Sequence, residues 1–166
     1  MTKKIPIQTL LDRIKANWPD AASPETDIIF SVIRFHEMIR IQTEKALKPF
    51  DLTHSAFEVL VALRAQPVPR QLTPTELGQS VLLSSGGTAN ILNELERRGL
   101  IERATNPKDG RSKIVLLTHI GEHLSEHVME SVMKHDKLHF EGFADEDAVI
   151  RHRDTVVELL RVIESQ

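Results

Sequence analysis

The sequence predicts a mainly α-helical protein with one small β-hairpin. Apolar residues recur at helical spacing over most of the chain, and serine or threonine caps mark the starts of several helices. Near residue 106, two apolar runs flank a turn-forming segment, which is the pattern of a hairpin. The 166 residues, of which 40% are hydrophobic and 27% charged, suffice for one globular domain or two small lobes that share a core.

Two helices are predicted before residue 49. Residues 5–17 place their apolar side chains on one helical face, and Pro19 interrupts that pattern. Ser23 is a good N-cap and Pro24 suits the first helical position, so a second helix is expected from about 24 to 48. Apolar residues cover two adjoining faces of this helix. One face can pack on its own domain, and the other is available to a second chain.

Two shorter helices are predicted between residues 53 and 83, separated by the Pro-rich loop "PVPRQ". Thr53 caps the first of them. Thr73 caps the second, where Glu76 completes a capping box. The residues expected to face inward in the first are Phe57, Leu60, Val61 and Leu63.

The next helix is expected to begin at Ser84 or Ser85 and to end at Arg98, with Gly99 as its C-cap. The segments "LIERA" and "SKIVLLT" are strand-like and "TNPKDGR" joins them as a turn; helices of about 119–139 and 145–163 follow. This order predicts a winged helix-turn-helix over residues 53–118, in which one helix lies in the major groove of DNA. Residues 1–52 and 119–166 then supply the N-terminal and C-terminal helices.

The segment "SSGG" gives the predicted recognition helix a small, hydroxyl-rich start. Small residues let a backbone approach DNA closely, and the free N–H groups there favour phosphate. Residues 84–113 hold six basic and four acidic residues, whereas residues 114–166 hold five and eleven, so the net charge of −3 does not exclude DNA. The alternative is that "SSGG" is only a capped loop. The candidate DNA contacts are Ser84, Ser85, Gly86, Thr88, Asn90, Arg97, Lys108, Asp109, Arg111 and Lys113.

The stretch "LSSGGTANILNELERRGLIERATNPKDGRSKIVLLTHIGEHL" resembles the core of the MarR family of bacterial transcription regulators. That resemblance covers residues 28–163 in element order. It implies a repressor that binds a pseudo-palindromic operator as a homodimer, dimerised through the N- and C-terminal helices. It also makes Arg111 the wing-tip arginine and Asp109 its orienting partner. The residues that carry the resemblance are Leu95, Glu96, Gly99, Leu100, Ile101, Arg103, Asp109, Arg111, Leu117 and Thr118.

Two positions depart from the family's pattern. Ile91 stands where many relatives have an arginine in the middle of the recognition helix, and Glu94 stands where a basic residue is frequent. Fewer cations facing the duplex predict weaker and less salt-sensitive DNA binding.

The N-terminal segment "LLDRIKANW" resembles the extra first helix of the urate-responsive subgroup. By this resemblance Trp18, Glu58 and Arg103 line a pocket for a small planar aromatic or anionic effector, with Ile91 in place of a further arginine. An aromatic face, a carboxylate and a guanidinium suit such a ligand. The alternative is that Trp18 only anchors its helix and that Glu58 is a solvated surface residue.

Other functions are less favoured by the sequence. The sequence shows neither a cofactor fingerprint nor a nucleophile elbow, so no motif in it indicates an enzyme. The absence of cysteine excludes a disulfide framework and a thiolate zinc site. Histidines recur every four residues at His119, His123 and His127, so a metal-responsive regulator is an alternative hypothesis. The favoured interpretation is that these histidines are solvated and bind no metal. A winged-helix protein-interaction module is the other alternative. We expect no cofactor, no membrane segment and a cytoplasmic location.

Overall fold

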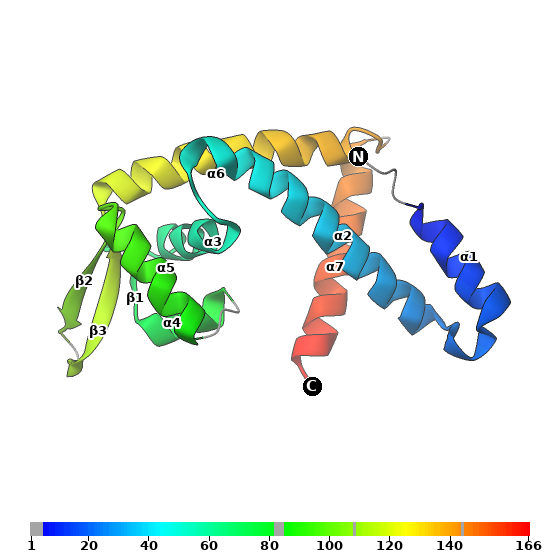
Figure 1. The fold of residues 1–166 in the computed structure, drawn as a ribbon, viewed down its shortest axis with the longest axis horizontal. Coiled ribbons are helices and arrows are strands. Elements are labelled where there is room, and N and C mark those ends of the chain that lie inside the picture. The colour runs from blue at the N-terminus through cyan, green and yellow to red at the C-terminus, as the bar shows by residue number, and fades with distance from the viewer. Residues whose placement is uncertain (1–4, 82–84, 108, 144) are drawn as a thin grey trace.

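A computed structural model describes residues 5–81, 85–107, 109–143 and 145–166 (Figure 1). It is mainly helical with one small antiparallel sheet, which confirms the predicted fold class. Within the described residues, no helix is both long enough and apolar enough to cross a membrane. The elements in chain order are α1 Ile7–Asn17, η1 Pro19–Ala21, α2 Pro24–Leu47, η2 Lys48–Phe50, α3 His54–Arg64, β1 Gln71–Leu72, α4 Pro74–Ser80, α5 Ser85–Arg97, β2 Ile101–Asn106, β3 Asp109–Leu117, α6 His119–Phe140 and α7 Glu146–Glu164, where η1 and η2 are short 3₁₀ helices.

The helix starts follow the predicted capping residues. The Ser23 hydroxyl accepts a hydrogen bond from the backbone N–H of Thr26 at 3.2 Å, which fixes the first turn of α2. The Thr53 hydroxyl accepts from the N–H of Ala56 at 3.1 Å and does the same for α3. Each cap supplies an acceptor for an N–H group that has no partner inside the helix.

The sheet contains one strand more than the predicted hairpin. Its order is β1-β3-β2, and β1 pairs antiparallel with β3 through Gln71 opposite Leu116 and Leu72 opposite Val115. The sequence pattern predicts a loop at residue 71, because a two-residue strand is too short to show an alternating pattern.

The core lies where α3, α5 and the base of the sheet meet the end of α2 and the first half of α6. The predicted inward residues of α3 are buried except Val61, which is partly buried, and Val59 is fully buried although it was not predicted. The largest fully buried side chains are Leu47, Val59, Leu60, Leu63, Leu77, Leu95, Ile101, Val115 and Val128.

The molecule is elongated, with different elements at its two ends (Figure 1). The winged helix, formed by α3, α4, α5 and the sheet, lies at one end, and α6 runs from the base of the sheet along one side. Helix α1 and the first half of α2 lie at the other end, and α7 runs down from the far end of α6 near the middle of the view. The guanidinium of Arg34 in α2 donates to the carbonyl of Ile5 at 2.7 Å, which ties the start of the described chain to α2.

Candidate nucleic-acid interface

Helices α4 and α5 form the helix-turn-helix, and local sequence sets where each begins or ends. At the start of α4, Thr73 Oγ1 accepts from the N–H of Glu76 at 3.2 Å, while the Glu76 carboxylate accepts from the N–H of Thr73 at 2.7 Å. Gly99 stops α5 with a φ of 69°, a conformation that glycine adopts without steric cost. The N–H of Leu100 then donates to the carbonyl of Leu95 at 3.0 Å, which closes the helix end.

Helix α5 has a buried face and an exposed face. Thr88 and Leu92 lie four residues apart and are only 4% and 2% exposed. Asn90 and Arg97 lie on the opposite face and are exposed. Thr88 is therefore not available to a duplex in this structure, which corrects the prediction that its hydroxyl donates to DNA. The reason is its spacing from Leu92, which puts both side chains on the inward face.

Arg97 is exposed but has an acidic partner on its own helix. Its Nη2 lies 2.6 Å from Glu94 Oε1, and its Nε lies 2.9 Å from Glu94 Oε2. This hydrogen bonding lowers the pKa of Glu94 and raises the pKa of Arg97. The neighbouring Arg98 instead donates to the carbonyls of Phe50 at 3.0 Å and Asp51 at 2.5 Å, so it anchors the end of α5 to the body.

The wing consists of β2 and β3, and hydrogen bonds fix its tip. The carboxylate of Asp109 accepts from the backbone N–H of Arg111 at 3.1 Å. The Ser112 hydroxyl donates to the carbonyl of Asp109 at 3.1 Å and accepts from Asn106 Nδ2 at 2.9 Å. Asp109 thus holds the turn through the backbone, and an ion pair with the Arg111 guanidinium is not among the contacts of the described residues. The Arg111 side chain itself is exposed.

Arg103 joins the wing to α5. Its Nη2 donates to Asn93 Oδ1 at 2.9 Å, and its Nη1 lies 3.2 Å from Glu96 Oε2. Both partners come from α5, so one side chain of β2 fixes the wing relative to that helix. A cavity of about 640 Å³ opens between α4, α5 and the wing, and both Arg103 and Lys113 line it.

The three predicted effector residues do not come together within one chain. Trp18 is 66% exposed at the end of α1, at the opposite end of the molecule from the wing (Figure 1). Glu58 lies in α3, where its Oε1 is 3.4 Å from His54 Nε2, and it lines a separate cavity of about 320 Å³. Arg103 lines the cavity beside α5 instead.

Several predicted residues fall outside what the structure describes. Ser84 and Lys108 are in this group, as are the side chain of Ser85 and the exposure of Gly86. Helix α5 begins at Ser85, next to the predicted cap position.

The histidines of α6 are close together but do not form a group of metal ligands. The rings of His119 and His123 have centroids 4.4 Å apart, and His127 Nδ1 lies 2.8 Å from the carbonyl oxygen of His123. Within the described part of the chain, no group of three or more His, Cys, Asp or Glu side chains is placed to hold a metal ion.

The sequence pattern of the MarR family matches residues 50–112, which run from the turn before α3 to the wing. The winged-helix segment is thus similar to the MarR family over somewhat more than a third of the chain. A curated relative of this segment from Bacillus cereus, an uncharacterized HTH-type transcriptional regulator, is 37% identical over 92 residues, which are 55% of this chain and 58% of the relative. The chain thus spans little more than half the length of the curated relatives it matches first.

Solved MarR-family structures resemble a larger part of the chain. A MarR-family transcriptional regulator from Rhodococcus sp. RHA1 superposes with a TM-score of 0.73 at 26% identity and covers 82% of this chain and 94% of its own. CouR from Rhodococcus jostii RHA1, bound to p-coumaroyl-CoA, gives a TM-score of 0.69 at 28% identity, over 80% and 91% of the two chains. The MarR-like fold therefore includes long helices outside the matched segment.

Proposed function

We propose that this protein is a DNA-binding transcription regulator of the MarR family. The observation that carries the proposal is the exposed face of α5 beside an exposed wing, both at one end of the molecule (Figure 1). On that face Asn90 suits a bidentate contact to adenine, and Arg111 at the wing tip suits a phosphate or the minor groove. The similarity to an HTH-type transcriptional regulator of Bacillus cereus supports the same function.

The regulator acts as a homodimer in this proposal. Helices α2 and α7 expose large apolar side chains that a second copy of the chain would cover, and such a surface is unusual on a monomer. The exposed residues include Ile29, Val32, Ile33 and Phe35 of α2 and Val156, Leu160, Val162 and Ile163 of α7. Two-fold symmetry would present two recognition helices to a pseudo-palindromic operator. The similarity to the MarR family favours a repressor, which would act by excluding other proteins from the duplex that it occupies.

A small aromatic anion is the effector that the cavity beside α5 would suit. Arg103 and Lys113 supply positive charge there, while Leu92 and Pro74 supply apolar lining. A ligand at this position would compete with the contacts from Arg103 to Asn93 and Glu96, so it would disturb the wing. Salicylate and urate are suitable probes. Calorimetric titration should show that Arg103→Met removes binding while Glu58→Gln, in the separate cavity, keeps it. Equal binding by both variants would place the effector elsewhere.

A mobility-shift experiment at two salt concentrations tests the main proposal. A DNA reader loses affinity steeply as salt rises, because its cations displace counterions from the duplex. A protein-interaction module that has kept only the winged-helix fold would shift no duplex at either concentration. That second result would reject the proposed function.

A further inference from the structure

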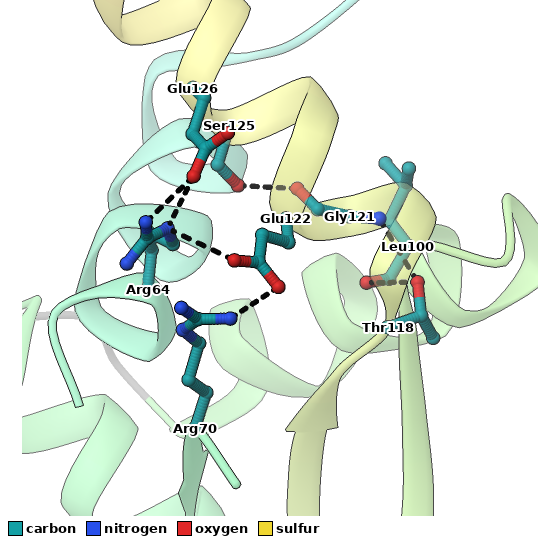
Figure 2. Close-up of polar contacts among 8 residues, drawn as sticks. All are labelled: Arg64, Arg70, Leu100, Thr118, Gly121, Glu122, Ser125 and Glu126. Carbon is teal, nitrogen blue, oxygen red and sulfur yellow. Dashed lines mark hydrogen bonds and ion pairs between the residues drawn. The ribbon is translucent and has the colours of Figure 1, made fainter. Parts of the chain in front are cut away.

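Four charged side chains connect the winged helix to the first turns of α6 (Figure 2). We call Arg64, Arg70, Glu122 and Glu126 the ionic clamp. Arg64, at the end of α3, places Nη2 2.7 Å and Nε 3.1 Å from Glu126 Oε1, and its Nε lies 3.9 Å from Glu122 Oε1. Arg70, just before β1, pairs through Nη1 with Glu122 Oε2. Two glutamates of one helix thus engage two arginines from separate parts of the winged helix.

The backbone of Arg70 is itself fixed to the sheet. Its carbonyl accepts from the N–H of Leu117 at the end of β3 at 3.1 Å, and its N–H donates to the carbonyl of Pro67 at 2.7 Å. The side chains of Arg70 and Glu122 are only 20% and 25% exposed, so salt screens this pair less than a fully exposed pair. The Glu122 carboxylate also lies in the first turn of α6, where the helix dipole favours a negative charge.

A second attachment joins α6 to the end of the recognition helix. The Thr118 hydroxyl donates to the carbonyl of Gly99 at 2.7 Å and accepts from the N–H of Gly121 at 3.0 Å. A Cβ atom at Gly121 would overlap the carbonyl oxygen of Leu100, so the backbones meet at a distance that only glycine permits. Figure 2 shows this junction beside the clamp, with Gly121 immediately before Glu122 on the same helix.

We propose that the ionic clamp positions the recognition helix for DNA by fixing the angle between the winged helix and α6. Core packing of Val128 already holds α6 against the winged helix, and the Thr118–Gly121 junction is the point at the very start of α6 about which the helix could still rock. Glu122 and Glu126 add ionic attachments in the first and second turns of α6, and these attachments resist rotation about the junction. Arg64, Arg70, Glu122 and Glu126 are thus positioning residues that need not touch DNA. This inference rests on the proposed function only in saying that the fixed angle serves DNA binding.

Paired spin labels on one chain can measure that angle directly. The chain has no cysteine, so Glu102→Cys in β2 and Lys137→Cys in α6 would carry the only two labels. The helix from His119 to Lys137 spans about 27 Å at 1.5 Å per residue, which suits pulsed electron paramagnetic resonance. Mixing with excess unlabelled chain removes distances between two labelled copies. We expect a narrow distance distribution in the parent protein.

Neutral and charge-swapped variants then test the clamp. Glu126→Gln should broaden the distribution, and Glu126→Arg or Arg64→Glu should broaden it further by repulsion. The double exchange of Arg64→Glu with Glu126→Arg should be narrower than either single variant, which a general loss of folding would not produce. The matched control is Glu130→Gln, because Glu130 pairs at 3.2 Å with Lys134 of its own helix. It should keep the parent width. A parent-like width in both Glu126 variants would overturn the proposal.

DNA affinity separates this inference from the proposed function. If the winged helix, once the clamp is broken, spends a tenth of its time in the binding orientation, its apparent affinity for DNA falls about tenfold. We expect that loss in Glu126→Arg and its partial recovery in the double exchange. Broadened label distances with unchanged DNA affinity would show a brace that does not position the recognition helix. A parent protein that binds no duplex would instead reject the proposed function, while the label distances still report on the clamp.

Discussion

At the wing tip, the Arg111 side chain is exposed while its backbone is held by Asp109. Arg111→Ala should therefore weaken DNA binding by about 1–3 kcal/mol and leave the thermal stability unchanged, since the side chain packs little. Fluorescence anisotropy titration of a labelled duplex measures the change. Lys134→Ala removes another exposed cation, on α6, and serves as the control. Equal affinities for Arg111→Ala and the parent would contradict the assignment of the wing.

On the exposed face of α5, Glu94 should reduce affinity for DNA. Its carboxylate neutralises Arg97 and faces the side on which a duplex would lie. Glu94→Gln should therefore tighten DNA binding and steepen the dependence of log affinity on log salt by about 0.9, the value for one added phosphate contact. The measurement is a set of binding titrations between low and moderate salt, with Glu130→Gln as the control. An unchanged slope would mean that Arg97 does not contact phosphate.

The residue scale also shows where sequence reasoning succeeds and fails. Capping residues such as Thr73 and the C-cap Gly99 were predictable, because their conformational preferences act within a few residues. Thr88 was assigned to the duplex by its chemistry, although its spacing from Leu92 already placed it on the inward face. The contacts of Arg103 with Asn93 and Glu96 connect different elements, so no local pattern could have predicted them.

At the scale of elements, the junction between α5, the sheet and α6 depends on one close backbone approach. Gly121→Ala would force a Cβ atom against the Leu100 carbonyl, where neither backbone can move independently. We expect a cost of about 1–3 kcal/mol, which lowers the Tm by roughly 2–4 °C per kcal/mol. Differential scanning calorimetry would detect it.

Gly142 offers a matched control for that change, since an added Cβ would have no heavy atom within 4 Å. Gly142→Ala should leave the Tm close to that of the parent. If Gly121→Ala behaves in the same way, the close junction with Leu100 does not exist in solution.

The elements were largely predictable because helical spacing and caps are local signals, whereas β1 was not. Its two residues, Gln71 and Leu72, form a strand only because β3 lies alongside them. The same limit applies to Arg70, which the sequence pattern places in a Pro-rich loop. Its carbonyl bonds to Leu117 and its side chain to Glu122, and both partners are far away in sequence.

At the scale of the whole molecule, the candidate DNA-reading surface lies at one end, and the exposed apolar helices α2 and α7 lie away from it (Figure 1). Helix α6 connects them, because it starts at the base of the sheet and ends beside α7. Contacts made by a second copy on α2 and α7 would thus reach the winged helix through α6 and the ionic clamp. The relation of Trp18 to Glu58 and Arg103 was not predictable at this scale, since it depends on tertiary and subunit arrangement rather than on spacing along the chain.

Selection of duplexes from a random double-stranded library tests the central claim most directly. A homodimeric DNA reader should enrich an inverted repeat whose half-sites are centred about 10–10.5 base pairs apart, or a multiple of that spacing. The enriched duplex should bind a dimer, as judged by light scattering of the complex, and should lose affinity as salt rises. Enrichment of a single half-site bound by one chain would contradict the dimer, and no enrichment at low salt would contradict sequence-specific DNA binding.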